Sequence, residues 1–305
     1  LDEVHKYPTW SKELKEIYDL YPSLQIVFSG SSLLNILNAD ADLSRRCLPY
    51  NMYGLSFREF LMFYKNIRIP VASLQEVLEN AGDICQGINE QCRPVQMFNE
   101  YLHDGYYPFF TGNREDYYMN IENVVNLILE QEMPLLCGVD PAYIRKLKAL
   151  LSILASSVPY EVDITKLAGT IGLTRNSVIT YLQNLDRAEL LKLLYSDLTS
   201  VKKMQKPDKI YLQNPNLLYA IASTSVQIGT ARETFAISQL SVNHEIEYGK
   251  TQGDFVVDHK YTFEVGGADK TFKQIADLPD SFILADNIEY ATGKKLPLWI
   301  IGLTY

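Results

Sequence analysis

Two adjacent carboxylates follow an apolar residue in the first run of the sequence, LDEVHKYPTW. They are Asp2 and Glu3, directly after Leu1. An aspartate at the end of an apolar strand can hold Mg²⁺, and a neighbouring glutamate can orient or deprotonate an attacking water. The pair alone has low specificity, because acids after a strand end are usually only solvated. Phosphate chemistry here would need further polar residues elsewhere in the chain.

Three such residues follow. Ser29 ends the apolar run LQIVFS, residues 24–29, which we expect to form a buried strand. A polar residue at that strand end could sense the terminal phosphate of a nucleotide. Arg45 and Arg46 then stand where a cation could reach a phosphate. Residues 10–21 have the apolar spacing of a helix, so the order strand, helix, strand predicts a parallel sheet covered by helices.

These runs together resemble a known family. LDEVHKYPTW, IVFSGSSLLNI and DLSRR followed by LSFREFL are similar to the bacterial and archaeal AAA-type P-loop ATPases. In that family a winged helix and a restriction-endonuclease-like domain of unknown function follow the ATPase core, and the resemblance spans nearly the whole chain. It implies Mg²⁺ and ATP as cofactors of the intact protein. It also implies that Asp2 binds the metal, that Glu3 orients the water and that Ser29 senses the γ-phosphate. Arg45 or Arg46 would contact a phosphate or a neighbouring subunit.

The sequence departs from the family in one respect. It contains no GxxxxGK[ST] motif, so the backbone N–H cradle and the lysine of a P-loop are missing from these residues. We therefore expect a C-terminal portion cut inside the Walker B strand, through the choice of fragment or naturally. We expect no nucleotide to bind this portion alone.

Residues 139–225 carry the pattern of a winged helix-turn-helix. Amphipathic helices are predicted over 144–155 and 163–171, a turn at Gly172, and a third helix capped by Thr174. Two strands joined by a lysine-bearing loop follow it, which completes the pattern.

This module could bind DNA or protein, and the sequence leaves both open. Lysines can neutralise phosphates, while arginine and asparagine can read base edges. The alternative is a solvated lysine hairpin, since lysine often protects edge strands. The predicted nucleic-acid-binding residues are Arg175, Asn176, Lys202, Lys203 and Lys206, with Asn184, Arg187, Lys192 and Lys209 as further candidates.

The last 80 residues contain five runs that we expect to form strands, the last of them residues 296–303, and they raise a second chemistry. A restriction-endonuclease-like site needs two carboxylates on adjacent strands for a divalent metal, and a lysine two residues after the second. Asp254 and Glu264 fit the acidic pair, with Glu233 on a helix as a third acid. Gly266 stands where the lysine is needed, so we expect no nuclease activity. Lys273 is the replacement lysine that the sequence suggests.

The predicted fold class is α/β multidomain. The domains are residues 1–64, the C-terminal half of an AAA core; 65–138, a helical lid; 139–225, the winged helix; and 226–305, a small restriction-endonuclease-like mixed sheet. The five tyrosines within residues 101–118 are expected to pack in the lid core rather than stack on bases.

The overall composition and net charge argue for some classes of protein and against others. A hydrophobic share of 47% and a charged share of 21% indicate a globular protein, and a net charge of −9 argues against a surface dominated by nucleic acid. Four cysteines without CxxC spacing favour reduced thiols, hence a cytoplasmic location, and no membrane span is expected. The main prediction is an ATPase segment with a partner-binding winged helix. A DNA-processing nuclease and a non-enzymatic protein-binding regulator are the alternatives; biological target and oligomeric state stay open.

Overall fold

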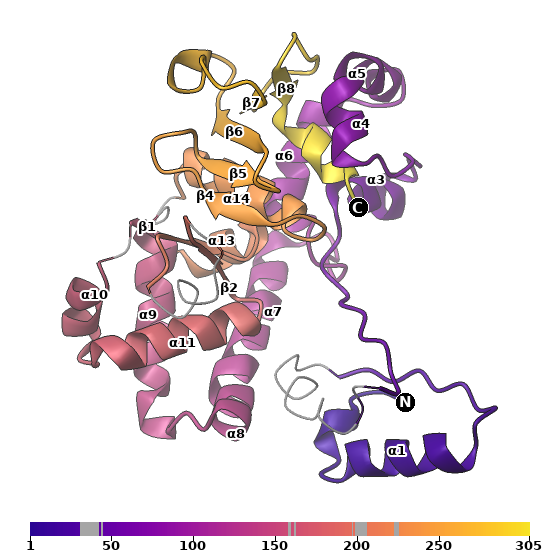
Figure 1. Ribbon diagram of the computed structural model, residues 1–305, viewed down its shortest axis with the longest axis vertical. Coiled ribbons are helices and arrows are strands. Elements are labelled where there is room, and N and C mark those ends of the chain that lie inside the picture. Colours follow the sequence, from indigo (N-terminus) through magenta and orange to yellow (C-terminus); the bar gives the residue numbers. More distant parts are fainter. Residues whose placement is uncertain are drawn as a thin grey trace.

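The chain forms a small N-terminal part and a larger main body, which residues 48–55 connect without helix or strand (Figure 1). The computed structural model describes residues 1–30, 43, 45–157, 160–161, 163–196, 198, 206–222 and 226–305. Within the described residues the secondary structure is mixed, with helices and two sheets, as predicted for the α/β class.

The N-terminal part is built on helix α1 (Trp10–Leu20), which follows a short 3-10 helix η1 (Val4–Lys6). Its small core consists of Val4, Trp10, Leu14 and Leu43, with Ile26, Phe28 and Cys47 packed against it. Among the described residues, this core is separate from that of the main body.

The expected buried strand over residues 24–29 does not form. The segment is extended and runs beside the first residues of the chain, with hydrogen bonds from Ser29 N to Leu1 O (2.9 Å) and from Val4 N to Ser29 O (3.0 Å). Val27 is 86% exposed. A strand of a parallel sheet is buried only when other strands and covering helices surround it. Among the described residues, this segment has only residues 1–4 as a pairing neighbour.

Between residues 57 and 157 the regular secondary structure of the described chain is entirely helical, with loops between the helices. Capping boxes begin α3 (Phe57–Lys65) and α4 (Leu74–Glu79), each formed by a serine and the glutamate three residues later. The remaining helices are α5 (Ala81–Asn89), α6 (Pro94–Asp104), α7 (Arg114–Leu127), the π-helical turn η2 (Ile128–Glu132), α8 (Met133–Cys137), η3 (Pro141–Tyr143) and α9 (Ile144–Ser157). The aromatic residues between 101 and 118 pack together in this region, as expected.

A three-helix and three-strand unit follows. Helices α9, α10 (Ile164–Ile171) and α11 (Arg175–Arg187) precede the strands β2 (Leu191–Leu194) and β3 (Lys209–Leu212). With β1 (Tyr160–Glu161) these form an antiparallel sheet in the order β1-β3-β2. Gly172 ends α10 at φ 65°, a left-handed conformation that favours glycine, and the Thr174 side chain caps α11, both at the expected positions.

The C-terminal sheet is mixed, as the sequence predicts. After α13 (Pro215–Ile221) and α14 (Ile228–Leu240), five strands lie in the order β4-β5-β6-β7-β8. The first three pair antiparallel and the last three parallel. Their bounds are β4 (Ile246–Tyr248), β5 (Phe255–Val257), β6 (Tyr261–Gly266), β7 (Ser281–Ala285) and β8 (Lys295–Pro297), with the 3-10 turn η4 (Phe272–Gln274) between β6 and β7.

The prediction of a strand over residues 296–303 is wrong for most of its length. Only its first two residues belong to β8, and the rest is the 3-10 helix η5 (Leu298–Leu303), buried along its whole length. A short continuous apolar run does not distinguish a buried strand from a buried helix. η5 packs against α14 and α3 and so closes the core of the main body.

One continuous hydrophobic core extends from Phe57 to Leu303. Helix α3 overlaps the segment that we grouped with the ATPase core, residues 1–64, yet it packs on α6 and η5 of the main body. The helical region, the three-strand unit and the C-terminal sheet therefore share one core.

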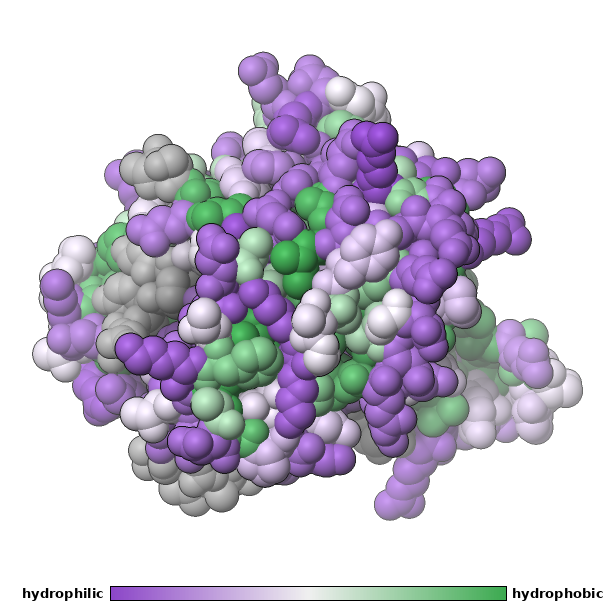
Figure 2. Space-filling model, turned by 90° about the horizontal axis from the view of Figure 1, so that it is seen from above, coloured by the Kyte–Doolittle hydropathy of each residue, from purple (hydrophilic) through white to green (hydrophobic). Residues whose placement is uncertain are grey.

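The upper face of the molecule mixes polar and apolar residues. Figure 2 shows polar residues over most of this face, with hydrophobic residues in separate areas between them. Among the described residues, no helix combines the length and the hydrophobicity that a bilayer crossing requires.

Candidate functional site

The predicted magnesium ligand and the predicted phosphate sensor lie in direct contact. The Ser29 hydroxyl donates a hydrogen bond to Oδ1 of Asp2, and the Glu3 amide lies 3.4 Å from Ser29 Oγ. The parallel backbone hydrogen bonds between residues 1–4 and 27–29 bring the ends of both segments to the same edge. The hydrogen bond from Ser29 is the main cause that lowers the pKa of Asp2.

The other predicted nucleotide residues are placed differently. The Glu3 carboxylate pairs with Lys6, while its backbone is left-handed at φ 50°. Arg46 forms a two-pronged ion pair with Asp19 at the end of α1, at 3.0 and 3.1 Å. Arg45 is exposed.

The predicted nucleic-acid-binding residues divide into three groups. Arg175 and Asn176 are exposed in the first turn of α11, and Lys206 is exposed before β3. Lys202 and Lys203 lie outside the described residues. Asn184 and Lys209, which the sequence also suggested, are 7% and 8% exposed, so neither is available to a macromolecule on the surface.

The acidic residues of the C-terminal sheet gather near its central strands. Glu264 lies on β6 and is 3% exposed, while Asp254 precedes β5 and accepts a hydrogen bond from the Val265 amide at 2.8 Å. Glu233 reaches the group from α14 and accepts a hydrogen bond from the Tyr211 hydroxyl at 2.6 Å. The topology thus brings together the three acids that the sequence singled out.

Charge repulsion and burial act together on two of these acids. Burial is the main cause that raises the pKa of Glu233, and the negative charges of Asp254 and Glu264 add to it. Burial likewise raises the pKa of Glu264, with a further contribution from Asp254. Two protein cations compensate this negative charge.

The first cation is Lys270, a residue that the sequence did not suggest. Its ammonium group forms an ion pair with Glu264. Its aliphatic stem crosses Gly266, where an added Cβ would lie 2.7–2.9 Å from the carbons of Lys270. Lys270 therefore fills the space that a side chain at position 266 would take. Lys273 is exposed on η4 and does not take this place, contrary to the suggestion from sequence.

The second cation comes from the neighbouring three-strand unit. Lys209 on β3 lies 3.7 Å from Glu233 and 5.1 Å from the centre of the Tyr248 ring. A backbone hydrogen bond from Tyr248 to Tyr195, 2.9 Å long, joins the two sheets beside it. A lysine of the three-stranded sheet thus compensates an acid that lies beside the C-terminal sheet, which no sequence motif indicated.

This cluster is better described as charge-compensated than as a metal centre. In the part of the chain that the structure describes, no group of three or more His, Cys, Asp or Glu residues could hold a metal ion. Metal binding by Asp254 and Glu264 stays a prediction. With both lysines in place, the carboxylates already have positive partners inside the protein.

Comparisons with known proteins connect the N-terminal part with ATPases. A family model described as an AAA domain matches residues 1–61, and a domain of unknown function (DUF8612) matches residues 95–227. The second match covers parts of both the predicted lid and the predicted winged helix. No solved structure shows a significant match to the chain.

One curated relative extends the similarity to an archaeon. The chain is 29% identical to the uncharacterized protein MJ1637 of Methanocaldococcus jannaschii over 215 aligned residues. The aligned region covers 69% of this chain. The chain spans about half the length of that relative, 45%. Together with the contact between Asp2 and Ser29, the family match relates residues 1–61 of this chain to the AAA-type ATPases.

Proposed function

We propose that residues 1–61 of this chain supply the metal and water half of the nucleotide site of an AAA-type ATPase. The hydrogen bond between Ser29 and Asp2 carries this proposal. It juxtaposes a cation-binding carboxylate and a hydroxyl donor at the ends of two parallel segments, the arrangement that a Mg·nucleotide requires.

Each residue then has one role. Asp2 would hold Mg²⁺, which would supply positive charge to the phosphates, and Ser29 would donate a hydrogen bond toward the terminal phosphate. Glu3, which pairs with Lys6 in this structure, would leave that ion pair to orient the attacking water and accept its proton. Arg45 offers a positive charge to a phosphate of this or a neighbouring subunit.

The glutamate gives the sharpest test of these roles. In a longer chain that adds a GxxxxGK[ST] loop, Glu3→Gln should keep Mg·ATP binding and lose turnover by a factor of at least about 100. Glu16→Gln, an exposed glutamate on α1, is the matched control and should hydrolyse ATP like the parent. Equal turnover by Glu3→Gln and the parent would remove Glu3 from the mechanism.

We further propose that α9, α10, α11 and the sheet β1-β3-β2 form a winged helix that contacts duplex DNA. The exposed Arg175 and Asn176 in the first turn of α11 support this assignment. A side chain at the start of a recognition helix is the one that reaches a base edge or a phosphate. The motion driven by ATP would then act on a nucleic-acid partner, whereas a protein partner is the outcome if DNA affinity is undetectable.

A further inference from the structure

A cavity of about 220 Å³ lies where four segments of the main body meet. Its lining comes from residues 52–54 of the connecting segment, the loop 106–109, helix α7 with η2, and the turn 188–190 after α11. This volume is below the range of about 300–1,000 Å³ that is usual for drug-sized ligands, so the cavity suits a small molecule or a single side chain. The predicted nucleotide residues and the acids of the C-terminal sheet are not part of its lining.

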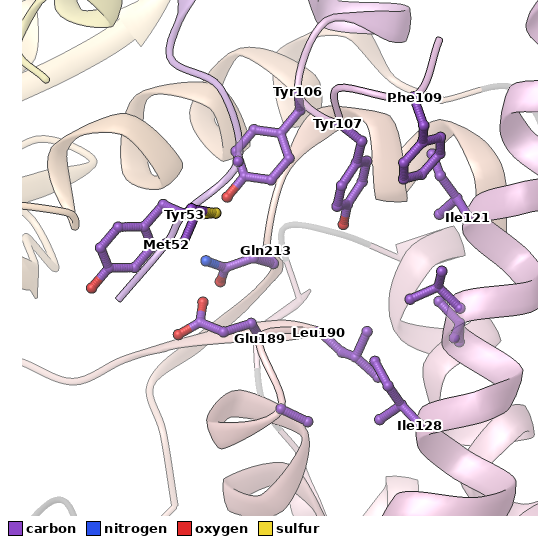
Figure 3. A pocket seen from close by; sticks show the side chains of 14 residues that line it. Met52, Tyr53, Tyr106, Tyr107, Phe109, Ile121, Ile128, Glu189, Leu190 and Gln213 are labelled. Carbon is purple, nitrogen blue, oxygen red and sulfur yellow. The ribbon is translucent and has the colours of Figure 1, made fainter. Parts of the chain in front are cut away.

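Aromatic side chains form much of one side of this cavity. Tyr53, Tyr106, Tyr107 and Phe109 all belong to the lining, and Figure 3 shows their rings along one side of it. Tyr106 meets Tyr107 edge to face with ring centres 5.0 Å apart, and Tyr107 stacks on Phe109 at 5.4 Å. The Asn214 amide donates a hydrogen bond of 2.9 Å to the Tyr107 hydroxyl, which holds that ring in place. Because the face of an aromatic ring is negative, a group of such rings attracts a cation.

The lining also includes an acidic residue, Glu189 (Figure 3). Burial is the main cause that raises the pKa of Glu189, while Lys192 and Asp186 act on its charge with opposite signs. Among the described residues, the carboxyl group accepts a hydrogen bond from the Gln213 amide and forms no ion pair. A partly buried carboxylate without a cationic partner costs free energy when it is charged, and a cation in the cavity would lower that cost.

The backbone at Glu189 gives independent support for a role of its side chain. Glu189 follows Ala188, the C-cap of α11, and has φ 56°. Glycine is usual at this position after a helix, and another residue in the left-handed conformation costs about 1–2 kcal/mol. The turn itself therefore does not explain a glutamate here, which directs attention to its carboxyl group.

We propose that this cavity binds a small organic cation, an ammonium group that carries methyl or other short alkyl groups. Glu189 supplies the negative charge, and the aromatic rings contact the alkyl groups. A bare ammonium group is strongly hydrated, so alkyl groups reduce the cost of entering a mainly apolar cavity. Ile121 and Ile128 enclose the ligand from the helical side (Figure 3). The inference goes beyond the proposed ATPase function and does not depend on it.

Isothermal titration calorimetry of the 305-residue chain tests the proposal with two probes of the same shape. Choline carries the cation, and 3,3-dimethylbutanol has a carbon atom in place of its nitrogen. We expect choline to bind at least about tenfold more tightly than the alcohol. Glu189→Gln should reduce this preference to about twofold or less, while Glu16→Gln, an exposed glutamate on α1, should keep it.

A second variant keeps the test decisive if Glu189→Gln does not fold. Tyr53 is half-buried, and Tyr53→Leu keeps an apolar side chain while it removes the ring. Choline should bind this variant several-fold more weakly, with the affinity for the alcohol within about twofold of that of the parent. Thermal unfolding shows whether each variant is folded.

A peptide that contains trimethyl-lysine is the third probe and distinguishes the source of the cation. Tighter binding of the peptide than of choline assigns the ammonium group to a protein side chain, and tighter binding of choline assigns it to a free molecule. Equal binding of choline and the alcohol by the parent, no binding of any probe, or an unchanged preference in folded Glu189→Gln or Tyr53→Leu would overturn the proposal.

Discussion

At the scale of single residues, Lys270 is the least expected feature of the molecule. It supplies the cation for Glu264, which is 3% exposed. Lys270→Met should therefore destabilise the fold by about 2 kcal/mol or more, because it leaves a buried carboxylate without its partner. Lys273→Met, on exposed η4, should change the free energy of unfolding by less than about 0.5 kcal/mol. Urea denaturation of both variants measures the difference, and equal stability would show that the ion pair contributes nothing.

The same ion pair bears on nuclease chemistry. The Lys270 ammonium group neutralises Glu264, and the described acids do not form a group that could hold a metal ion. We expect no cleavage of plasmid DNA by this chain with Mg²⁺ or Mn²⁺. Reproducible nicking that Glu264→Ala abolishes would contradict this expectation. Lys270 would then be the lysine to substitute next, since it occupies the space above Gly266.

Glu233 gives the molecule a pH dependence with a definite sign. Its pKa is raised in the folded protein, chiefly by burial. Its contribution to stability is therefore complete below the unfolded pKa and is lost as pH rises through the folded value. Glu233→Gln keeps an acceptor for Tyr211 and removes this loss. The unfolding temperature of Glu233→Gln minus that of the parent should therefore increase from pH 4.5 to pH 8. The same difference for Glu122→Gln, an exposed glutamate on α7, should not change with pH. A constant difference would show that Glu233 does not titrate differently on folding.

The residues of both candidate sites were predictable to different degrees. Asp2 and Ser29 could be paired from sequence, because the ends of neighbouring parallel segments meet at one edge. The acids Asp254 and Glu264 could be paired because their strands are adjacent. The pairing of Lys270 with Glu264 could not be predicted, because Lys270 lies after β6 in a loop whose path depends on tertiary packing. Lys209 belongs to another sheet, and no local pattern relates it to Glu233.

At the scale of elements, α11 is the part of the molecule whose function is most open to test. Arg175 in its first turn is exposed. If it contacts a phosphate, Arg175→Ala should weaken duplex binding and reduce the salt dependence by about one unit of slope. Arg68→Ala, an exposed arginine before α4, should bind like the parent. Fluorescence anisotropy at several salt concentrations measures this. Undetectable binding by the parent at low salt would favour a protein partner instead.

Helices proved easier to predict than strands. The positions of α10 and α11 follow from apolar spacing, Gly172 and the Thr174 cap, all of which are local. Residues 24–29 and 296–303 are apolar runs without such local start and stop signals, and both were predicted as strands. Whether such a run pairs, coils or stays extended depends on neighbours that the run itself does not encode.

At the scale of the whole molecule, the described hydrophobic residues form separate clusters in the N-terminal part and in the main body. The cluster of the N-terminal part consists of Val4, Trp10, Leu14 and Leu43, while the largest cluster draws residues from Phe57 to Leu303 and a small third one contains Ile275, Ile283 and Ala285. The chain spans about half the length of its archaeal relative. The N-terminal part presents the Asp2 and Ser29 edge, but the 305 residues contain no P-loop motif to complete it.

The affinity for Mg·ATP tests the central claim most directly. Most of the affinity of a P-loop site comes from backbone N–H groups and a lysine around the phosphates. Asp2 and Glu3 alone repel a triphosphate unless Mg²⁺ bridges them. Calorimetric titration should therefore show no tight binding to the 305-residue chain, and micromolar binding to a longer chain that includes a GxxxxGK[ST] loop. Micromolar binding by the 305-residue chain itself would mean that the phosphate site lies elsewhere, and would contradict the assignment of residues 1–61 as half of a nucleotide site.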